Sequence, residues 1–222
     1  MNTYFIIEYF VKNGVPLDTV VLILMLPIIA TLIAFFRQVF GVKAFGIYTP
    51  SIITFAFLAI GHNSRWNGVK YGTTIFIGVI FVGMVTRFIL KKFRLLYLPR
   101  LAITLSIVAL SILLMLVLGG TLHRTGLASV SIFPLLIMIT IVEKFVAAQI
   151  EKGTRTAVIL ALETLFISLF GYFVASWDVL IKIILNYPWI ILLTFPLNFI
   201  LGKWTGLRVV EYWRFKEILK RN

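Results

Sequence analysis

"FRQVFGVKAFGIYTPSI", residues 36–52, lies between two apolar runs and holds two glycines, two cations, a tyrosine and a proline. Gly41 and Gly46 allow the backbone to turn sharply or to approach another segment closely. Pro50 disfavours a helical conformation at the residue before it, but it suits the first turn of a helix. We therefore expect residues 41–49 to be non-helical and a helix to follow them.

The composition around this stretch is that of a membrane protein. Of the 222 residues, 61% are hydrophobic and only 13% are charged, which is too apolar for an average soluble domain. A hydrocarbon core of about 30 Å needs about 20 apolar residues in a helix. Seven runs reach or approach that length, so we predict an all-α polytopic protein with seven transmembrane helices. The predicted spans are 19–36, 45–60, 71–89, 101–117, 129–142, 155–175 and 179–201. The second and fifth are short, and each has a proline near its start.

Cations segregate between the loops in a way that predicts orientation. With the N-terminus outside and the C-terminus inside, the outer side receives Lys12, Arg65, Lys70, Arg124 and Lys182, and every other lysine and arginine of the 21 is inner. Inner loops of membrane proteins are enriched in lysine and arginine. A basic face that meets anionic lipid head groups explains the net charge of +13. Nucleic acid is therefore not an expected partner, and a prokaryotic cytoplasmic membrane is the expected location.

Three regions follow from this topology. Residues 1–18 form an amphipathic outer interfacial segment, and residues 19–201 form the seven-helix membrane domain. Residues 202–222 form a basic amphipathic cytoplasmic tail. That tail either lies on the inner leaflet or docks a cytosolic protein. The candidate docking residues are Arg208, Glu211, Arg214 and Lys216.

A weak internal repeat is visible. "GVKAFGIYTPSII", residues 41–53, resembles "GLASVSIFPLLI", residues 126–137, if one residue is skipped. The two segments would enter the membrane from opposite sides, three spans apart. An inverted repeat of spans one to three on spans four to six would place a binding site near the midplane, as in many transporters. Chance similarity between two apolar segments is the alternative.

The opening stretch is also a candidate site for an anion on the inner side. Non-helical backbone at membrane depth is tolerated where it is buried in protein or lines a wet cavity. Free N–H groups at the start of a helix, together with cations, attract an anion or carboxylate. The alternative is an ordinary cytoplasmic turn with lipid-facing cations. The candidate residues are Arg37, Lys43, Gly46, Tyr48, Thr49, Pro50, Arg94 and Arg100.

Among the eight acidic residues, only Glu163 lies well inside a predicted span. An intramembrane carboxylate is costly and indicates a proton site or a partner for an internal cation. The alternative is a protonated side chain that holds helices together by a hydrogen bond to a backbone carbonyl. A second group of acids and bases marks one inner border, where ion pairing explains it as well as substrate contact does. This cluster comprises Glu143, Lys144, Glu151 and Arg155.

Catalysis by this chain alone is not expected. Cysteine is absent, and the two histidines lie in predicted outer loops without a companion carboxylate at metal-ligand spacing. The sequence has no zincin motif, nucleophile elbow or phosphate-binding glycine loop. We expect neither a metal nor a cofactor.

Four segments in order, "RQVFGVKAFGIYTPSIITFAFL", "LPRLAITLSIV", "IVEKFVAAQIEKGTRTA" and "GLRVVEYWRFKEI", resemble the domain of seven transmembrane helices that is usually fused to an inactive transglutaminase-like domain. More distantly, the chain is similar to the small membrane subunit of poly-gamma-glutamate capsule synthesis. The resemblance implies an extracytoplasmic transglutaminase-like domain. Only 18 residues precede the first predicted span, so we expect the role of that domain to be either absent or supplied by a separate chain. It also implies a neighbouring cytosolic ATP-grasp ligase.

The resemblance leads to the first functional hypothesis. The chain would anchor such a peptide or amide ligase at its basic inner face, and would export or hand over the acidic product. Two alternatives stay open: a proton-coupled secondary transporter of a small anion that uses Glu163, and a receptor or scaffold that transports nothing.

Overall fold

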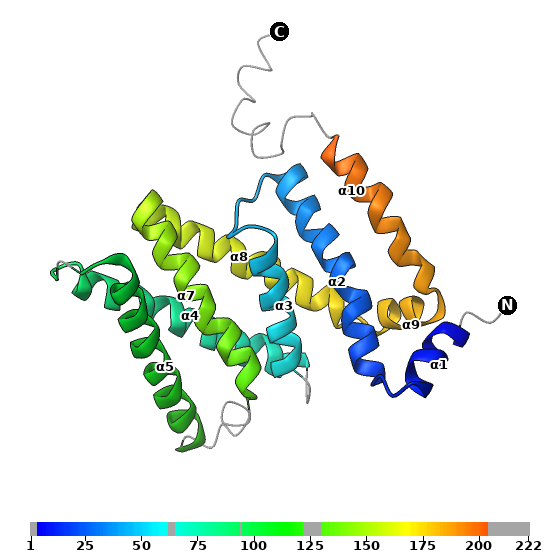
Figure 1. Cartoon of the computed structure of the whole chain (residues 1–222), viewed down its shortest axis with the longest axis horizontal. Coiled ribbons are helices and arrows are strands. Elements are labelled where there is room, and N and C mark those ends of the chain that lie inside the picture. Colours follow the sequence, from blue (N-terminus) through cyan, green and yellow to red (C-terminus); the bar gives the residue numbers. More distant parts are fainter. Residues whose placement is uncertain (1–3, 62–64, 94, 122–129, 204–222) are drawn as a thin grey trace, which may run out of the picture.

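The computed structural model describes residues 4–61, 65–93, 95–121 and 130–203, and every regular element in these ranges is a helix. The expected docking residues of the C-terminal tail, Arg94 and the start of the second repeat segment lie outside them. In chain order the elements are α1 (Tyr4–Lys12), α2 (Leu17–Phe35), the π-helix η1 (Phe36–Phe40), α3 (Tyr48–Ile60), α4 (Arg65–Leu90), α5 (Tyr97–Thr121), α7 (Ile132–Lys152), α8 (Thr154–Ala175), α9 (Asp178–Asn186), the 3-10 helix η2 (Pro188–Leu193) and α10 (Thr194–Gly202) (Figure 1).

Five helices are long and apolar enough to cross a membrane: α2 with η1, α4, α5, α7 and α8. A sixth span exists if α9 and the η2–α10 segment are counted together, although they are bent by 100°. The remaining predicted span is α3, whose 13 residues reach only about 20 Å, less than the hydrocarbon thickness. All seven predicted apolar runs therefore contain helix, but not all are simple spans.

Two predicted spans are wrong in detail. The fifth, 129–142, is not short: α7 continues to Lys152, because the charged pair Glu143 and Lys144 ends the apolar run without breaking the helix. The seventh, 179–201, is broken after Asn186, where Tyr187 leaves helical geometry. Pro188 explains the break, since it lacks an N–H and disfavours helix at the residue before it.

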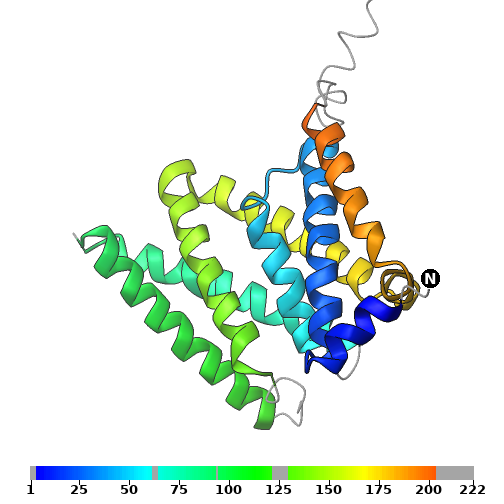
Figure 2. The same ribbon diagram turned by 45° about the vertical axis from the view of Figure 1, so that its right-hand side comes forward.

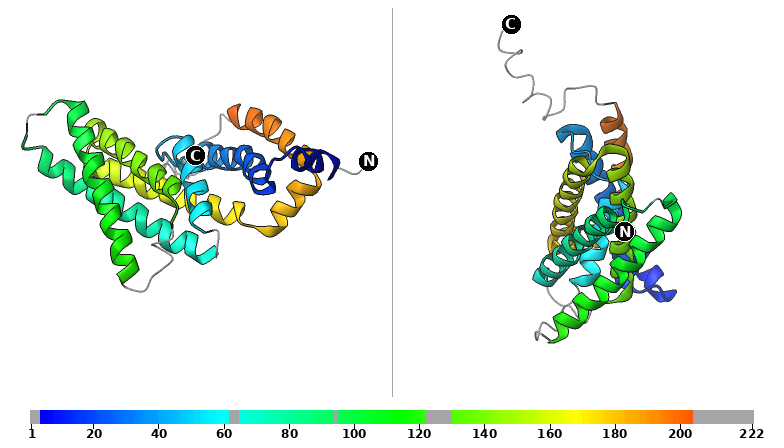
Figure 3. Two further views of the ribbon diagram at one scale, coloured as in Figure 1. Left: turned by 60° about the horizontal axis from the view of Figure 1, so that its bottom comes forward. Right: turned by 90° about the vertical axis from the view of Figure 1, so that its left-hand side faces the viewer.

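The helices form two groups (Figures 1 and 2). In one group α3, α4, α7 and α8 pack against one another, and α5 covers α4 and α7. In the other, α10 lies along α2, with α1 and α9 near the start of α2 (Figure 3). The largest core cluster belongs to the first group and includes Phe57, Met138, Val142 and Tyr172.

Small residues set the close approach of these helices. A Cβ at Gly72 of α4 would come within 2.5 Å of the ring of Phe57 on α3, and one at Gly171 of α8 within 2.7 Å of the Thr54 hydroxyl. Close helix contacts of this kind stabilise helix pairs in membranes. Outside the core, large apolar side chains such as Ile23, Phe88 and Phe195 are exposed, as expected for surfaces that face lipid.

The ends of the helices gather on two sides. The segment between α2 and α3, the α7–α8 junction and the end of α10 point one way, and the ends of α3 and α5 point the other (Figure 1). Arg37, Lys43, Lys144 and Lys152, four of the cations that the charge pattern places inside, lie on the first side. Which side faces the cytoplasm stays a prediction.

Candidate functional site

The loop between η1 and α3 is built on left-handed backbone. Gly41 ends η1 with φ 83°, and Ala44 and Gly46 follow with φ 39° and 87°. Residues 41–47 are non-helical, as predicted, but α3 begins at Tyr48, so the expectation for Tyr48 and Thr49 is wrong. Pro50 is the third residue of α3, where a missing N–H costs no helical hydrogen bond. The loop therefore delivers three consecutive amides, 43–45, toward α8.

Side chains of α8 bind all three of these amides. The Glu163 Oε2 atom accepts the N–H of Lys43 at 2.8 Å and that of Ala44 at 3.0 Å. The Thr164 Oγ1 atom accepts the N–H of Phe45 at 3.0 Å and donates to the Leu160 carbonyl at 2.6 Å. The intramembrane carboxylate is thus an acceptor for loop backbone, and the partners that it binds here are amides rather than the carbonyl that we expected as one alternative.

Below the loop, buried hydroxyls join α3 to α8. The Thr54 hydroxyl lies 2.9 Å from the Pro50 carbonyl and 3.1 Å from that of Ser168. The Ser168 hydroxyl lies 3.1 Å from the same Pro50 carbonyl. Thr49 donates to the Phe45 carbonyl at 2.8 Å. Thr49 and Pro50 are both buried, so they hold the loop in place from beneath.

The accessible side of the loop, away from α3, lines a pocket of about 660 Å³, which we call the basic pocket. It collects residues from η1, the loop, α7 and α8. Four of them are cations and one is a carboxylate. Its charged members are Arg37, Lys43, Lys144, Lys152 and Glu151, and Thr156 adds a hydroxyl.

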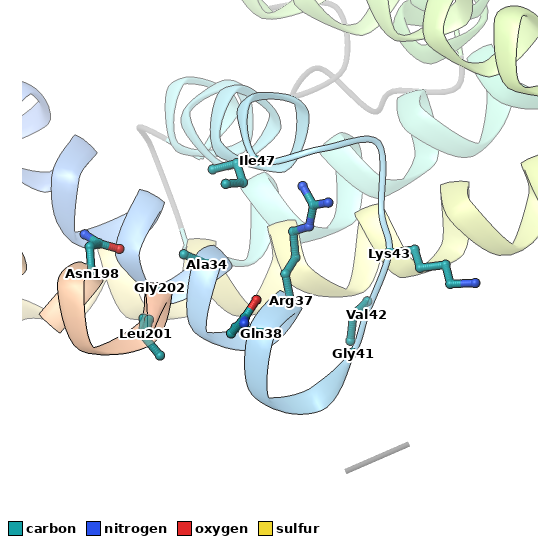
Figure 4. A pocket seen from close by; sticks show the side chains of 10 residues that line it. All are labelled: Ala34, Arg37, Gln38, Gly41, Val42, Lys43, Ile47, Asn198, Leu201 and Gly202. Atoms are coloured by element: carbon teal, nitrogen blue, oxygen red, sulfur yellow. The ribbon is translucent and has the colours of Figure 1, made fainter. Parts of the chain in front are cut away.

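A smaller pocket of about 370 Å³ adjoins the basic pocket at Arg37 and Lys43, which line both. Its far wall is the end of α10, where Asn198 donates to the Thr31 hydroxyl of α2 at 2.8 Å. Figure 4 shows the Arg37 guanidinium rising from η1 toward the loop, while the Lys43 side chain points away from Asn198. Arg37 is half-buried and Lys43 is exposed. These two cations therefore flank the loop on its accessible side.

The structure brings together some of the predicted site residues. Arg37, Lys43 and Gly46 share the basic pocket with Lys144 and Glu151 of the inner-border cluster. Thr156 is a pocket residue that the sequence pattern did not single out, and Lys152, which the pattern places at the inner border, was not predicted to join Arg37 and Lys43. The available signal was helical spacing, because Lys144 and Lys152 are eight residues apart on a helix that continues through both.

Other predicted residues lie elsewhere. Tyr48 is 83% exposed, and neither pocket includes it. Arg100 lies on α5 and donates to the Leu95 carbonyl at 3.0 Å, away from the loop. Glu143 and Arg155 are exposed and do not line the basic pocket. Arg94, Arg208, Glu211, Arg214 and Lys216 lie outside the described residues.

Long apolar helices, exposed apolar surfaces and a charged loop border define an integral membrane protein. A family of 7 transmembrane helices usually fused to an inactive transglutaminase matches residues 13–219, and the chain belongs to this family. The resemblance to this seven-helix family is thereby confirmed, and the more distant similarity to the poly-gamma-glutamate subunit stays a prediction. No curated protein and no solved structure matches the chain.

Proposed function

We propose that the protein binds a carboxylate-rich molecule in the basic pocket, on the cytoplasmic side, as the membrane partner of a cytosolic ATP-grasp-type peptide or amide ligase. The molecule would be the acidic product of that ligase, which the protein receives for hand-over or export. One observation carries the binding step: four cations and a single carboxylate surround a pocket of about 660 Å³.

The pocket suits several carboxylates better than one. Arg37 is half-buried, and its planar guanidinium can hold a carboxylate with two parallel hydrogen bonds. The lysines at 43, 144 and 152 are exposed, so each contributes about 0–1 kcal/mol and is screened by salt. A chain of glutamate units would contact several of them at once. Binding should therefore strengthen steeply with the number of carboxylates and weaken with ionic strength.

The family supports one further part of the proposal, the association with a transglutaminase-like domain. Its members are usually fused to an inactive transglutaminase, which fits a membrane domain that works beside other domains. An extracytoplasmic transglutaminase-like domain would meet the outer side, and the basic tail at 202–222 would anchor the ligase. The ligase must be identified by experiment, and the predicted N-out orientation must be measured.

The binding step is tested by titrating oligo-γ-glutamate into the protein in nanodiscs of neutral lipid and measuring heat. We expect Arg37→Gln to weaken binding about tenfold and Lys144→Gln or Lys152→Gln about two- to fivefold, since a charged hydrogen bond contributes more than an exposed ion pair. Lys70→Gln and Lys182→Gln, which remove cations from the opposite side, are the matched controls. Equal weakening by the controls, or equal affinity for uncharged oligo-γ-glutamine, would contradict the proposal.

The proton-coupled transporter is the weaker alternative. Its proposed carrier, Glu163, uses one carboxylate oxygen to hold two loop amides. A receptor or scaffold without transport remains compatible with the same pocket, and it differs by giving binding without uptake in proteoliposomes.

A further inference from the structure

A third pocket lies between α4, α7 and α8, with a volume of about 410 Å³. Its polar residues are Arg87 in the last turn of α4, Lys91 just after that helix, Gln149 of α7 and Thr154 of α8. Its apolar wall includes Val85 and Phe88. It shares no residue with the basic pocket. The two are separate sites near the α7–α8 junction.

Gln149 is the unusual member of this pocket. Its side chain is only 3% exposed, and its Oε1 atom has no hydrogen-bond partner among the described residues. A buried amide oxygen without a donor is costly, and an apolar side chain would fill the same space without that cost. Because Gln149 lines the pocket, the missing donor is best supplied by a ligand that carries a hydroxyl or N–H group.

The charges beside Gln149 favour an anion. Arg87 is half-buried, lies near enough to Arg100 for their like charges to interact, and has no ion pair with a described carboxylate. Thr154 begins α8, a helix of 22 residues whose N-cap, Gly153, offers no side-chain acceptor. The first N–H groups of such a helix, at the positive end of its dipole, favour a bound anion.

The apolar wall places the ligand at the membrane border. Phe88 and Val85 are 76% and 40% exposed, and both lie in the last turns of the span Trp66–Leu90. An acyl chain could follow this face of α4 while a head group occupies the pocket. We propose that the pocket binds a phosphate that carries a hydroxyl donor, the chemistry of a glycerol phosphate head group, with the phosphate at Arg87 and Lys91 and the hydroxyl donating to Gln149.

The test measures the unfolding temperature of the detergent-solubilised protein with added phosphatidylglycerol, phosphatidylcholine or free glycerol 3-phosphate. We expect phosphatidylglycerol to raise the unfolding temperature and phosphatidylcholine to have little effect. Arg87→Gln and Lys91→Gln should at least halve that rise. Lys91 is exposed, so its variant should fold normally. Gln149→Leu should raise the unfolding temperature without lipid and reduce the further rise with lipid.

Lys70→Gln, at the other end of α4, and Arg37→Gln, in the basic pocket, are the controls and should keep the full rise. An undiminished rise in Arg87→Gln and Gln149→Leu, or an equal reduction in Lys70→Gln, would overturn the site. A rise with glycerol 3-phosphate as large as with phosphatidylglycerol supports the site and identifies a soluble ligand, whereas a rise with the lipid alone identifies a lipid site. Oligo-γ-glutamate binding by Arg87→Gln should be unchanged, so this site and the proposed function can fail separately.

Discussion

At the scale of single residues, the structure gives Glu163 a different role from the proton site that its sequence position suggested. Its position inside an apolar helix marks it as a residue with a special role, but its partners, Lys43 and Ala44, lie about 120 positions away in the chain. No local pattern could reveal that contact. The carboxylate oxygen satisfies two backbone donors that would otherwise need water at the edge of the membrane. Glu163 therefore shapes the loop that carries Lys43, and reaches the basic pocket only through it.

This role separates two substitutions at position 163. Gln keeps a carbonyl oxygen that can accept both N–H groups, whereas Ala removes the acceptor. We expect Glu163→Ala to lower the free energy of unfolding by about 1–3 kcal/mol and to weaken oligo-γ-glutamate binding. Glu163→Gln should lie within about 1 kcal/mol of the wild type and should bind nearly normally. Thermal unfolding in detergent and titration calorimetry measure both effects.

A proton carrier predicts a different pattern. Both variants would then abolish pH-coupled uptake in proteoliposomes, and they would do so even where the loop is intact. Thr164→Val serves as a control, because it removes the acceptor for Phe45 alone and should weaken the loop less than Glu163→Ala. If Glu163→Gln folds normally but loses uptake completely, Glu163 is a proton carrier after all.

At the scale of elements, the decisive contact is that of α3 with α8. Hydroxyl groups and a glycine, rather than helix length, hold the short α3 against α8. The Thr54 hydroxyl is fully buried between the Pro50 and Ser168 carbonyls, and Gly171 leaves room for it. A well-packed core accepts added atoms only by shifting side chains or backbone.

Gly171→Ala should therefore separate the two helices. The new Cβ would lie 2.7 Å from the Thr54 hydroxyl, which cannot rotate away without losing its hydrogen bonds. We expect a loss of about 1–3 kcal/mol in the free energy of unfolding, measured as a lower unfolding temperature. Gly78→Ala on α4 is the matched control: its Cβ would meet only the flexible Met115 side chain at 3.4 Å, so it should be neutral or slightly stabilising. Equal losses in both variants would show that the contact is not specific.

Elements also show how far the sequence could predict the fold. Apolar runs locate helices well, because burial in lipid demands them. They locate helix ends poorly. Glu143 and Lys144 end the apolar run, yet α7 continues to Lys152. The opposite error occurs at Pro188, where apolarity continues but the helix breaks. For the basic pocket, the sequence pointed separately to the cations beside Gly41 and to the acids and bases of the inner border. It could not predict that they meet, because Lys152 joins the pocket through the unexpected length of α7.

At the scale of the whole molecule, charge segregation is the property on which the proposal depends. The loop at 41–47, the α7–α8 junction and the end of α10 point the same way (Figure 1). The basic pocket and the pocket at Arg87 both lie near this border. A cytosolic acidic product can reach the basic pocket only if this border faces the cytoplasm. The charge bias predicts that orientation.

The absence of cysteine from the sequence makes orientation directly measurable. Two single-cysteine variants report on the two sides. Lys152→Cys lies in the basic pocket, and Lys70→Cys lies near the start of α4. Both side chains are exposed, so both substitutions should be tolerated. With a membrane-impermeant maleimide, Lys70→Cys should react in intact cells or right-side-out vesicles. Lys152→Cys should react only after permeabilisation or in inverted vesicles, because the bilayer blocks the reagent. The reverse pattern would place the basic pocket outside, where the charge bias would be reversed and a cytosolic ligase could not deliver its product to it.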